Sequence, residues 1–360
     1  MEMQKLIEKI EKLSDPRRQW GNKRHKLVDL VFIGLVSVIC GGTDFEHMED
    51  TGYGKEEWLK QYLELPNGIP DSDTFRRVFE RLDPQELAEI LSEVGDVCGK
   101  TVAVDGKTIC GSGNGKHKAY HVVSAWVAEN RMTLGQLATE EKSNEITAVP
   151  ELLDMLDVQG STVTIDAIGC QKSIASKVVE KGADYVLAVK MNQPTLHEDI
   201  KLYFEKEKAA WGTKTLEKDH GRIEMREYFI ETDISWLSGR NDWADLCAIG
   251  MVRSSVTSTK TGEFTQETRY FITSLTDINE FADSVRKHWS IESQLHWQLD
   301  VSFREDASRA RKDNSPLNMN ILRKQALTLL NAADLGKRVS LKRKMYKAAM
   351  DNSALDFIFS

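Results

Sequence analysis

Two aspartates in this 360-residue chain stand where an apolar run ends. Asp105 follows such a run in "VAVDGKT", and Asp166 follows one in "VTIDAIG". Runs of this kind are typical of buried β-strands, and ligand sites in open sheets favour the carboxyl ends of strands. Asp-Gly is also a common turn signal, so for Asp105 a turn and a functional site are both open.

A glutamate occupies an unusual position in the helical pattern of "HWSIESQLHWQLDVSFRED". A period of about 100° per residue places Glu292 on one apolar arc with Val285, Trp289, His296 and Leu299. A buried carboxylate without a partner costs several kcal/mol or must be neutralised. The pattern therefore predicts that Glu292 faces something that compensates its charge.

The expected order of elements brings the three carboxylates together. Three strands, a helix and a fourth strand follow residue 101, and the first and fourth strands can be neighbours. Asp105 and Asp166 would then lie side by side, with Glu292 facing them from a helix packed on that edge. Three converging carboxylates cannot all stay ionised without cations, and oxygen ligands suit Mg²⁺ or Mn²⁺. Two such ions about 4 Å apart act on phosphodiesters, which predicts a nucleic acid substrate.

Two alternatives use other residues of the same helix. His288, Glu292 and His296 have the i, i+4, i+8 spacing of a zinc set, although this leaves both aspartates unexplained. Asp300 is a possible substitute for Glu292, although it lies at the edge of the apolar arc.

The charge of the chain is unevenly distributed. The net charge is -8, yet segment 17–26 holds five Lys or Arg and segment 337–347 holds six, neither with an acidic residue. Such segregation favours local phosphate-binding surfaces on an acidic body, and solvated helix ends are the alternative.

The first 98 residues show helical periodicity almost throughout. The expected helices are 2–13, 24–40, 43–63, 73–82 and 85–97. The helix that begins after "PDSD" presents Arg76 and Arg77 and is a candidate for the second helix of a helix-turn-helix, although many small helical domains do not bind DNA. The apolar run 27–40 contains Asp29 and is too short to span a membrane, so it predicts a buried helix.

The pattern changes at residue 101. Strands are expected in 101–106, 120–128, 133–141, 161–169 and 184–190, with helices at 147–158 and 171–182. This order predicts a mixed sheet with helices on its faces. Residues 197–283 are charged and contain further strand patterns. The five cysteines form no CxxC pair, and with no signal-peptide pattern at the amino terminus they indicate a reduced, cytoplasmic protein.

The chain resembles the DDE transposases of bacterial insertion sequences, within them the group that includes the H-repeat-associated proteins of Rhs elements. The resemblance covers nearly the whole length. It is carried by "VAVDGKT", "EKSNEITAVPELL", "VTIDAIGCQ", "GADYVLAVKMNQ" and "HWSIESQLHWQLDVSFREDASRAR", in the order and with the spacing of the family.

The resemblance implies an α/β, RNase H-like core with a β-rich insertion before the last acidic helix. Asp105, Asp166 and Glu292 would be the catalytic triad and would hold two Mg²⁺ or Mn²⁺ ions. It also implies double-stranded DNA as the partner, recognition of element ends, a homodimer that joins two ends, and cleavage followed by strand transfer. For a bacterial protein this means the cytoplasm, in association with the nucleoid.

Related transposases carry Tyr, Arg and Lys at fixed offsets around the glutamate, where this chain has Val285, His288 and Leu299. The backbone contacts of those residues cannot be transferred to this chain. Arg304, Arg309 or Arg311 are expected to serve instead. Lys107 and Lys190 stand beside strand ends where they could also meet phosphate, with a solvated lysine as the alternative, and the two arginines of the helix-turn-helix candidate are further expected contacts.

The expected domains are an N-terminal helical, DNA-binding region at 1–98, the first part of the core at 99–196, the insertion at 197–283, the acidic helix that completes the core at 284–335 and a basic tail at 336–360. Two other functions remain open. One is a metal-dependent nuclease without strand transfer, and the other is a catalytically silent or domesticated DNA-binding protein.

Overall fold

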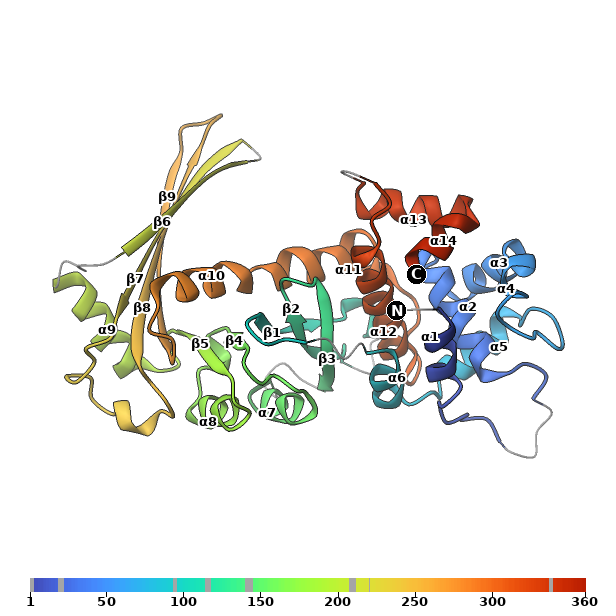
Figure 1. Ribbon diagram of the computed structural model, residues 1–360, viewed down its shortest axis with the longest axis horizontal. Helices are drawn as coiled ribbons and strands as arrows, with labels where there is room; N and C mark the ends of the chain where they lie inside the picture. Colours follow the sequence, from blue (N-terminus) through green and yellow to red (C-terminus); the bar gives the residue numbers. More distant parts are fainter. Residues whose placement is uncertain are drawn as a thin grey trace. The chain divides into compact units, whose positions relative to one another are not determined.

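The computed structural model describes residues 3–18, 23–92, 96–113, 118–139, 145–206, 212–219, 221–336 and 339–360 (Figure 1). Parts of the two basic segments and of one family motif lie outside these ranges, at 19–22, 337–338 and 141–144. Residue contacts divide the chain into two compact units. We call them the helical unit (Met1–Gly95, Gly106–Asn144 and Glu292–Ser360) and the sheet unit (Asp96–Asp105 and Glu145–Ile291).

Nine strands of the described residues form one mixed sheet. They are β1 (Thr101–Thr108), β2 (His121–Val127), β3 (Met132–Thr139), β4 (Thr162–Ile165), β5 (Asp184–Val189), β6 (Gly212–Asp219), β7 (Arg222–Glu231), β8 (Ala248–Ser258) and β9 (Phe264–Thr273). Their order is β3-β2-β1-β4-β5-β9-β8-β7-β6, in which β1, β4 and β5 pair in parallel and β5 pairs antiparallel with β9. The predicted α/β class, a mixed sheet with flanking helices, is confirmed.

The helices of the sheet unit include α7 (Glu145–Met155), α8 (Lys172–Glu180), α9 (Pro194–Lys206) and α10 (Ile278–His288). In Figure 1, α7 and α8 lie on one side of β4 and β5, and α10 lies on the other side. The ring of Phe281 in α10 packs on Gly250 of β8 so closely that a Cβ there would lie 2.3 Å from it. Phe281 and Val285 also share an apolar cluster with Tyr228 and Phe271. Strands β7 to β9 therefore hold α10 in place.

The predicted succession of three strands, helix, strand, helix and strand from residue 101 to 190 is confirmed by β1 to β5 with α7 and α8. Two elements of the insertion were not expected. Helix α9 buries only Ile200 and Phe204, and β6 is polar on both faces. Strand β6 forms because all eight of its residues pair with β7, which a hydrophobic pattern cannot indicate.

The predicted N-terminal helices correspond to α1 (Met3–Ile10), α2 (Leu27–Ile39), α3 (Phe45–Gly54) with α4 (Glu56–Leu59), α5 (Ser72–Phe79) and α6 (Pro84–Leu91). The later helices of this unit are α11 (Trp297–Val301), α12 (Ser315–Ala332), α13 (Leu341–Met350) and α14 (Asn352–Ile358). The basic segment at the end of the chain is thus largely helical.

Helix α12 is the centre of the helical unit. Its residues from Ser315 to Leu330 are all buried, and it contacts α2, α5, α6 and β3. Asn318 donates two hydrogen bonds, at 2.8 and 2.9 Å, to the carbonyl oxygens of Phe79 and Leu82 at the end of α5. A buried polar side chain thus satisfies the carbonyl groups that a helix end leaves without partners.

Every residue of α2 is buried, as the apolar run predicted. The carboxylate of Asp29 accepts a hydrogen bond of 3.3 Å from the backbone N–H of Lys26 at the start of this helix. Burial raises the pKa of Asp29 to about 6, although this hydrogen bond and the Lys26 charge act in the opposite direction. None of the helices in the described part of the chain is long and apolar enough to cross a membrane.

Asp29→Asn is expected to stabilise the protein above pH 6 and not below pH 4. A carboxyl group whose pKa is raised by folding contributes its stability below the unfolded value of 3.8, and loses it as pH rises through about 6. The amide keeps an oxygen that can accept from Lys26 and carries no charge. Urea unfolding at pH 5 and pH 8 should show a gain at pH 8 that is larger by about 1.4 kcal/mol. An equal effect at both pH values would contradict the burial argument.

Candidate active site

Asp105 and Asp166 lie next to each other in the sheet unit. The parallel pairing of β1 with β4 runs from Thr101↔Thr162 to Val104↔Ile165, and the next residue of each chain is the aspartate. Neighbouring strands are about 4.8 Å apart, so the two half-buried carboxyl groups start from adjacent backbone positions. The predicted neighbourhood of the first and fourth strands is confirmed.

The two aspartates differ in local structure. Asp166 caps the 3₁₀ turn Ala167–Gly169, and its Oδ1 accepts a hydrogen bond of 3.0 Å from the N–H of Ile168. Asp105 does not end its strand as predicted, because β1 continues to Thr108. A turn at Asp105 and Gly106 is therefore excluded. Only the parallel pairing of β1 with β4 ends at this position.

Glu292 does not lie on a buried apolar arc, and this prediction was wrong. The helix changes to a π-helical turn over Ile291–His296, and Glu292 is exposed. The fully buried residues here are Ile291, Leu295 and Leu299, so the apolar side passes beside Glu292. A π-helical turn bonds i to i+5, so the 100° period fails there, and such turns occur frequently at functional sites. Glu292 belongs to the helical unit and the aspartates to the sheet unit, so convergence of all three stays a prediction.

The end of α10 is fixed to the sheet unit by two contacts. His288 Nδ1 is hydrogen-bonded to Thr164 Oγ1 of β4 at 2.9 Å, two residues before Asp166. Burial lowers the pKa of His288 to about 4, against the opposing charge of Asp166. Two guanidinium groups lie over the ring of Trp289, that of Arg269 at 4.5 Å and that of Arg226 at 5.7 Å from its centroid. These cation–π contacts hold the residues just before the π-helical turn.

The zinc alternative gains no support. The Nδ1 atom of His288 is engaged by Thr164. Within the residues that the structure describes, no group of three or more His, Cys, Asp or Glu side chains is arranged to hold a metal ion, which applies to this zinc set and to Asp105, Asp166 and Glu292 alike.

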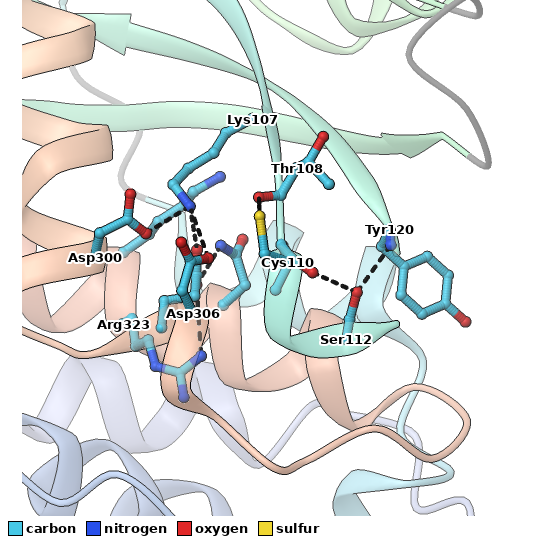
Figure 2. A network of polar contacts seen from close by, with 12 residues as sticks. Lys107, Thr108, Cys110, Ser112, Tyr120, Asp300, Asp306 and Arg323 are labelled. Atoms are coloured by element: carbon cyan, nitrogen blue, oxygen red, sulfur yellow. Dashed lines mark hydrogen bonds and ion pairs between the residues drawn. The ribbon is translucent and has the colours of Figure 1, made fainter. Parts of the chain in front are cut away.

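Lys107 contacts carboxylates. Its Nζ lies 2.7 Å from Asp300, and the side chain is only 12% exposed (Figure 2). Burial alone would lower the pKa of Lys107, but the charges of Glu305 and Asp300 raise it above its usual value. Asp300 is therefore engaged by a lysine, which disfavours it as the substitute for Glu292.

A cleft of about 560 Å³ in the helical unit gathers four of the five arginines that were candidates for DNA contact. We call it the arginine cleft; its basic lining residues are Arg76, Arg304, Arg309, Arg311 and Lys312. Arg304 and Arg309 are exposed, and Arg304 has a left-handed backbone with φ 54°. Acidic residues also line the cleft: Asp44, Glu46, Asp73 and Glu80.

The basic residues of the cleft differ in how firmly they are held. Arg76 is paired with Asp73 at 2.6 Å and with Glu80 at 3.2 Å. Arg311 Nε donates to the carbonyl oxygen of Gly111 at 2.9 Å. The exposed Arg304 and Arg309 are therefore the residues of the cleft best placed to meet an anion.

The other basic candidates lie outside this cleft. Arg77 is exposed and pairs with Asp73 at 3.4 Å, and Lys190 is exposed after β5 in the sheet unit. In the first basic segment, Arg17 and Lys23 pair with Asp15 at 2.8 and 3.1 Å. In the second, Lys344 donates to two carbonyl oxygens at the end of α12. Several basic side chains of these segments are therefore already paired with acidic side chains or carbonyl oxygens of the protein itself.

A mixed sheet in which two aspartates end a parallel strand pair, with an acidic helix later in the chain, is the arrangement of an RNase H-like, DDE-type enzyme. Two family models match the chain: "DDE_Tnp_1-associated" over residues 7–93 and "Transposase DDE domain" over residues 97–329. The second covers well over half of the chain, so this protein belongs to the DDE transposase family.

Relatives extend the match to nearly the whole length. The chain is 39% identical to the "Putative transposase YncI" of Escherichia coli O157:H7, covering 100% of this chain and 95% of the relative. It is 36% identical to the "H repeat-associated putative transposase YhhI" of Escherichia coli (strain K12), covering 99% and 97%. The predicted resemblance to this family, and to its H-repeat-associated group, is therefore confirmed.

Thr164→Val is expected to destabilise the protein by about 1–3 kcal/mol, because it leaves the Nδ1 of the partly buried His288 without its partner. The matched control is Thr162→Val on the same strand, where the same change affects a half-buried residue. Urea unfolding of both variants measures the difference. Equal stabilities of the two variants would show that the His288 contact does not anchor α10.

Proposed function

We propose that this protein is a DNA transposase that cleaves phosphodiesters at the ends of a mobile element and joins the freed 3′ ends to target DNA. The observation that carries the proposal is the adjacent pair Asp105 and Asp166 at the end of a parallel strand pair, in a chain of the DDE family. Glu292 is the third acidic residue of the proposed site.

The donor groups suit hard divalent cations. Asp105, Asp166 and Glu292 offer carboxylate oxygens, which Mg²⁺ and Mn²⁺ prefer. Asp166 is oriented by its hydrogen bond from Ile168, and Glu292 is exposed and needs no buried partner of its own. When bound, two such ions would activate the attacking oxygen and stabilise the leaving oxygen.

The arginine cleft is the proposed contact for the DNA backbone in the helical unit. Arg304 and Arg309 are exposed there and offer planar donors that match phosphate oxygens. Arg76 and Arg311 would line the same path, and Arg77 and Lys190 remain further candidates. Lys107 is not included, because carboxylates already surround its ammonium group.

The proposal keeps the domain roles expected from the sequence: 1–98 as a DNA-binding region, 99–196 and 284–335 as the catalytic core, 197–283 as the insertion and 336–360 as a basic end. The protein would act as a homodimer that holds two element ends, in the cytoplasm and in association with the nucleoid. A dimer would supply one active site for each end of the element.

Cleavage of DNA is expected to depend on Mg²⁺ or Mn²⁺ and to fall by about a hundredfold or more in Asp105→Asn, Asp166→Asn and Glu292→Gln, because each change removes a charge that holds the cations. The measurement uses full-length protein, plasmids carrying the flanking sequence of the gene, and a joining assay with a pre-cleaved end. Calorimetry with Mn²⁺ alone, on the wild type and Asp166→Asn, tests the site without knowledge of the DNA sequence.

The outcomes separate three functions. Cleavage with joining supports the transposase. Cleavage without joining of a pre-cleaved end indicates a nuclease without strand transfer. DNA binding that survives all three substitutions, with neither cleavage nor Mn²⁺ binding in the wild type, indicates a DNA-binding protein without catalytic activity.

The double variant Arg304→Ala with Arg309→Ala is expected to weaken DNA binding and to reduce the slope of log K against log salt by about 2, since each lost phosphate contact removes about 0.9. Arg240→Ala removes an exposed arginine of the sheet unit and serves as the control. Fluorescence anisotropy with labelled duplex DNA at four salt concentrations measures the slopes. If the double variant keeps the wild-type slope, the cleft does not contact the DNA backbone.

A further inference from the structure

We propose that Lys107 is a positioning residue whose contacts with Asp300 and Glu305 fix the chain directly after Asp105 to the chain that follows Glu292. The inference rests on the proposed function, since it assigns a role in placing two of the three proposed metal ligands. It concerns contacts within the helical unit.

Lys107 meets three carboxylates. Its Nζ lies 2.7 Å from Asp300, 3.4 Å from Glu305 and 3.7 Å from Asp306 (Figure 2). In a strand, residues two apart point to the same face, so Lys107 projects from β1 on the face of Asp105. Asp300 lies in α11, which continues from the π-helical turn that contains Glu292. One ammonium group therefore joins the two segments that carry proposed ligands.

The contact is anchored in the core by Glu305. This carboxylate is fully buried and accepts hydrogen bonds from Asn320 at 2.8 Å and from Arg323 at 3.4 Å, both on α12. Burial alone would raise the pKa of Glu305, but Arg323, Lys107 and Asn320 hold it below its usual value. A buried ion must keep its charged partners. Glu305 therefore holds Lys107 in place in addition to the half-exposed Asp300.

A second contact between the same segments does not depend on charge. A Cβ at Gly111, in the turn after β1, would lie 2.8 Å from the carbonyl oxygen of Ser308 and 2.9 Å from that of Asp306. Arg311 also donates to the carbonyl oxygen of Gly111. The end of β1 and the turn after α11 are thus packed backbone to backbone, which leaves Lys107 little freedom to change partners.

Lys55 is a lysine of the same unit whose contacts are purely structural. It is 8% exposed and donates to the carbonyl oxygen of Ala348 at 3.1 Å and to Asn352 at 2.9 Å. It joins the end of α3 to α13 and α14, none of which carries a proposed ligand. Lys55→Met is therefore a matched control that loses a buried lysine but leaves the proposed site alone.

The test is calorimetric Mn²⁺ binding by the full-length protein, combined with thermal unfolding. Lys107→Met is expected to weaken Mn²⁺ binding by roughly 10- to 100-fold, the usual effect of losing a group that orients metal ligands. Lys55→Met should lower the melting temperature without changing Mn²⁺ affinity. Lys107→Arg, which keeps the charge, should recover part of the affinity.

A second variant covers the case in which Lys107→Met does not fold. Asp300→Asn removes the nearest partner of Lys107 and leaves Glu305 paired, and it should also weaken Mn²⁺ binding. Wild-type affinity in a folded Lys107→Met or in Asp300→Asn would overturn the positioning role while leaving the proposed function intact. Absence of Mn²⁺ binding in the wild type, both free and with DNA, would overturn the proposed metal site itself and this inference with it.

Discussion

The burial of one carboxylate, Glu305, determines much of the helical unit. An unpaired buried charge is prohibitively costly, and removing one partner of a buried pair costs about 3–5 kcal/mol. Arg323, Asn320 and Lys107 together stabilise the buried charge of Glu305. These partners come from α12 and from the end of β1, so the requirement of a single side chain brings together the strand after Asp105, the turn after α11 and the central helix. An apolar residue at 305 would impose no such geometry, because apolar packing is not directional.

The sheet unit imposes a different constraint, that of register. In a parallel pair, the position of one residue fixes the position of every residue opposite it, and a slip by one residue would turn the side chains to the other face. The pairing of Val104 with Ile165 therefore places Asp105 and Asp166 at adjacent positions of the sheet. Thr164, one residue before Ile165, holds His288 and so ties the same strand to the helix that precedes Glu292. Strand β4, which has only four residues, thus positions both Asp166 and the helix that leads to Glu292.

Hydrophobic periodicity, which is a local property of the sequence, predicted the strands and helices that depend on it. The apolar runs before Asp105 and Asp166, the alternation of strands and helices up to residue 190 and the buried helix α2 could all be recognised from hydrophobic periodicity. The partners of Lys107 could not, because 193 residues separate it from Asp300 (300 - 107 = 193) and "FREDASRAR" resembles a solvated charged segment. Polar residues on every side of α12, among them Asn318 and Arg323, likewise conceal a helix that is buried from Ser315 to Leu330. The assignment of all three acidic residues to one site came from the expected order of elements and from the family resemblance, and the structure pairs only the strands of Asp105 and Asp166.

The exposure of Glu292 changes the physical problem that this residue presents. On a regular α-helix it would have been a buried charge in need of compensation. The π-helical turn instead keeps Ile291, Leu295 and Leu299 buried and leaves the carboxylate in solvent. A solvated carboxylate has almost no desolvation cost and can accept a hydrated cation directly, whereas a buried one would first need neutralisation by the protein. Two acidic residues of this region thus differ in environment: Glu305 is buried and paired, and Glu292, the proposed metal ligand, is exposed.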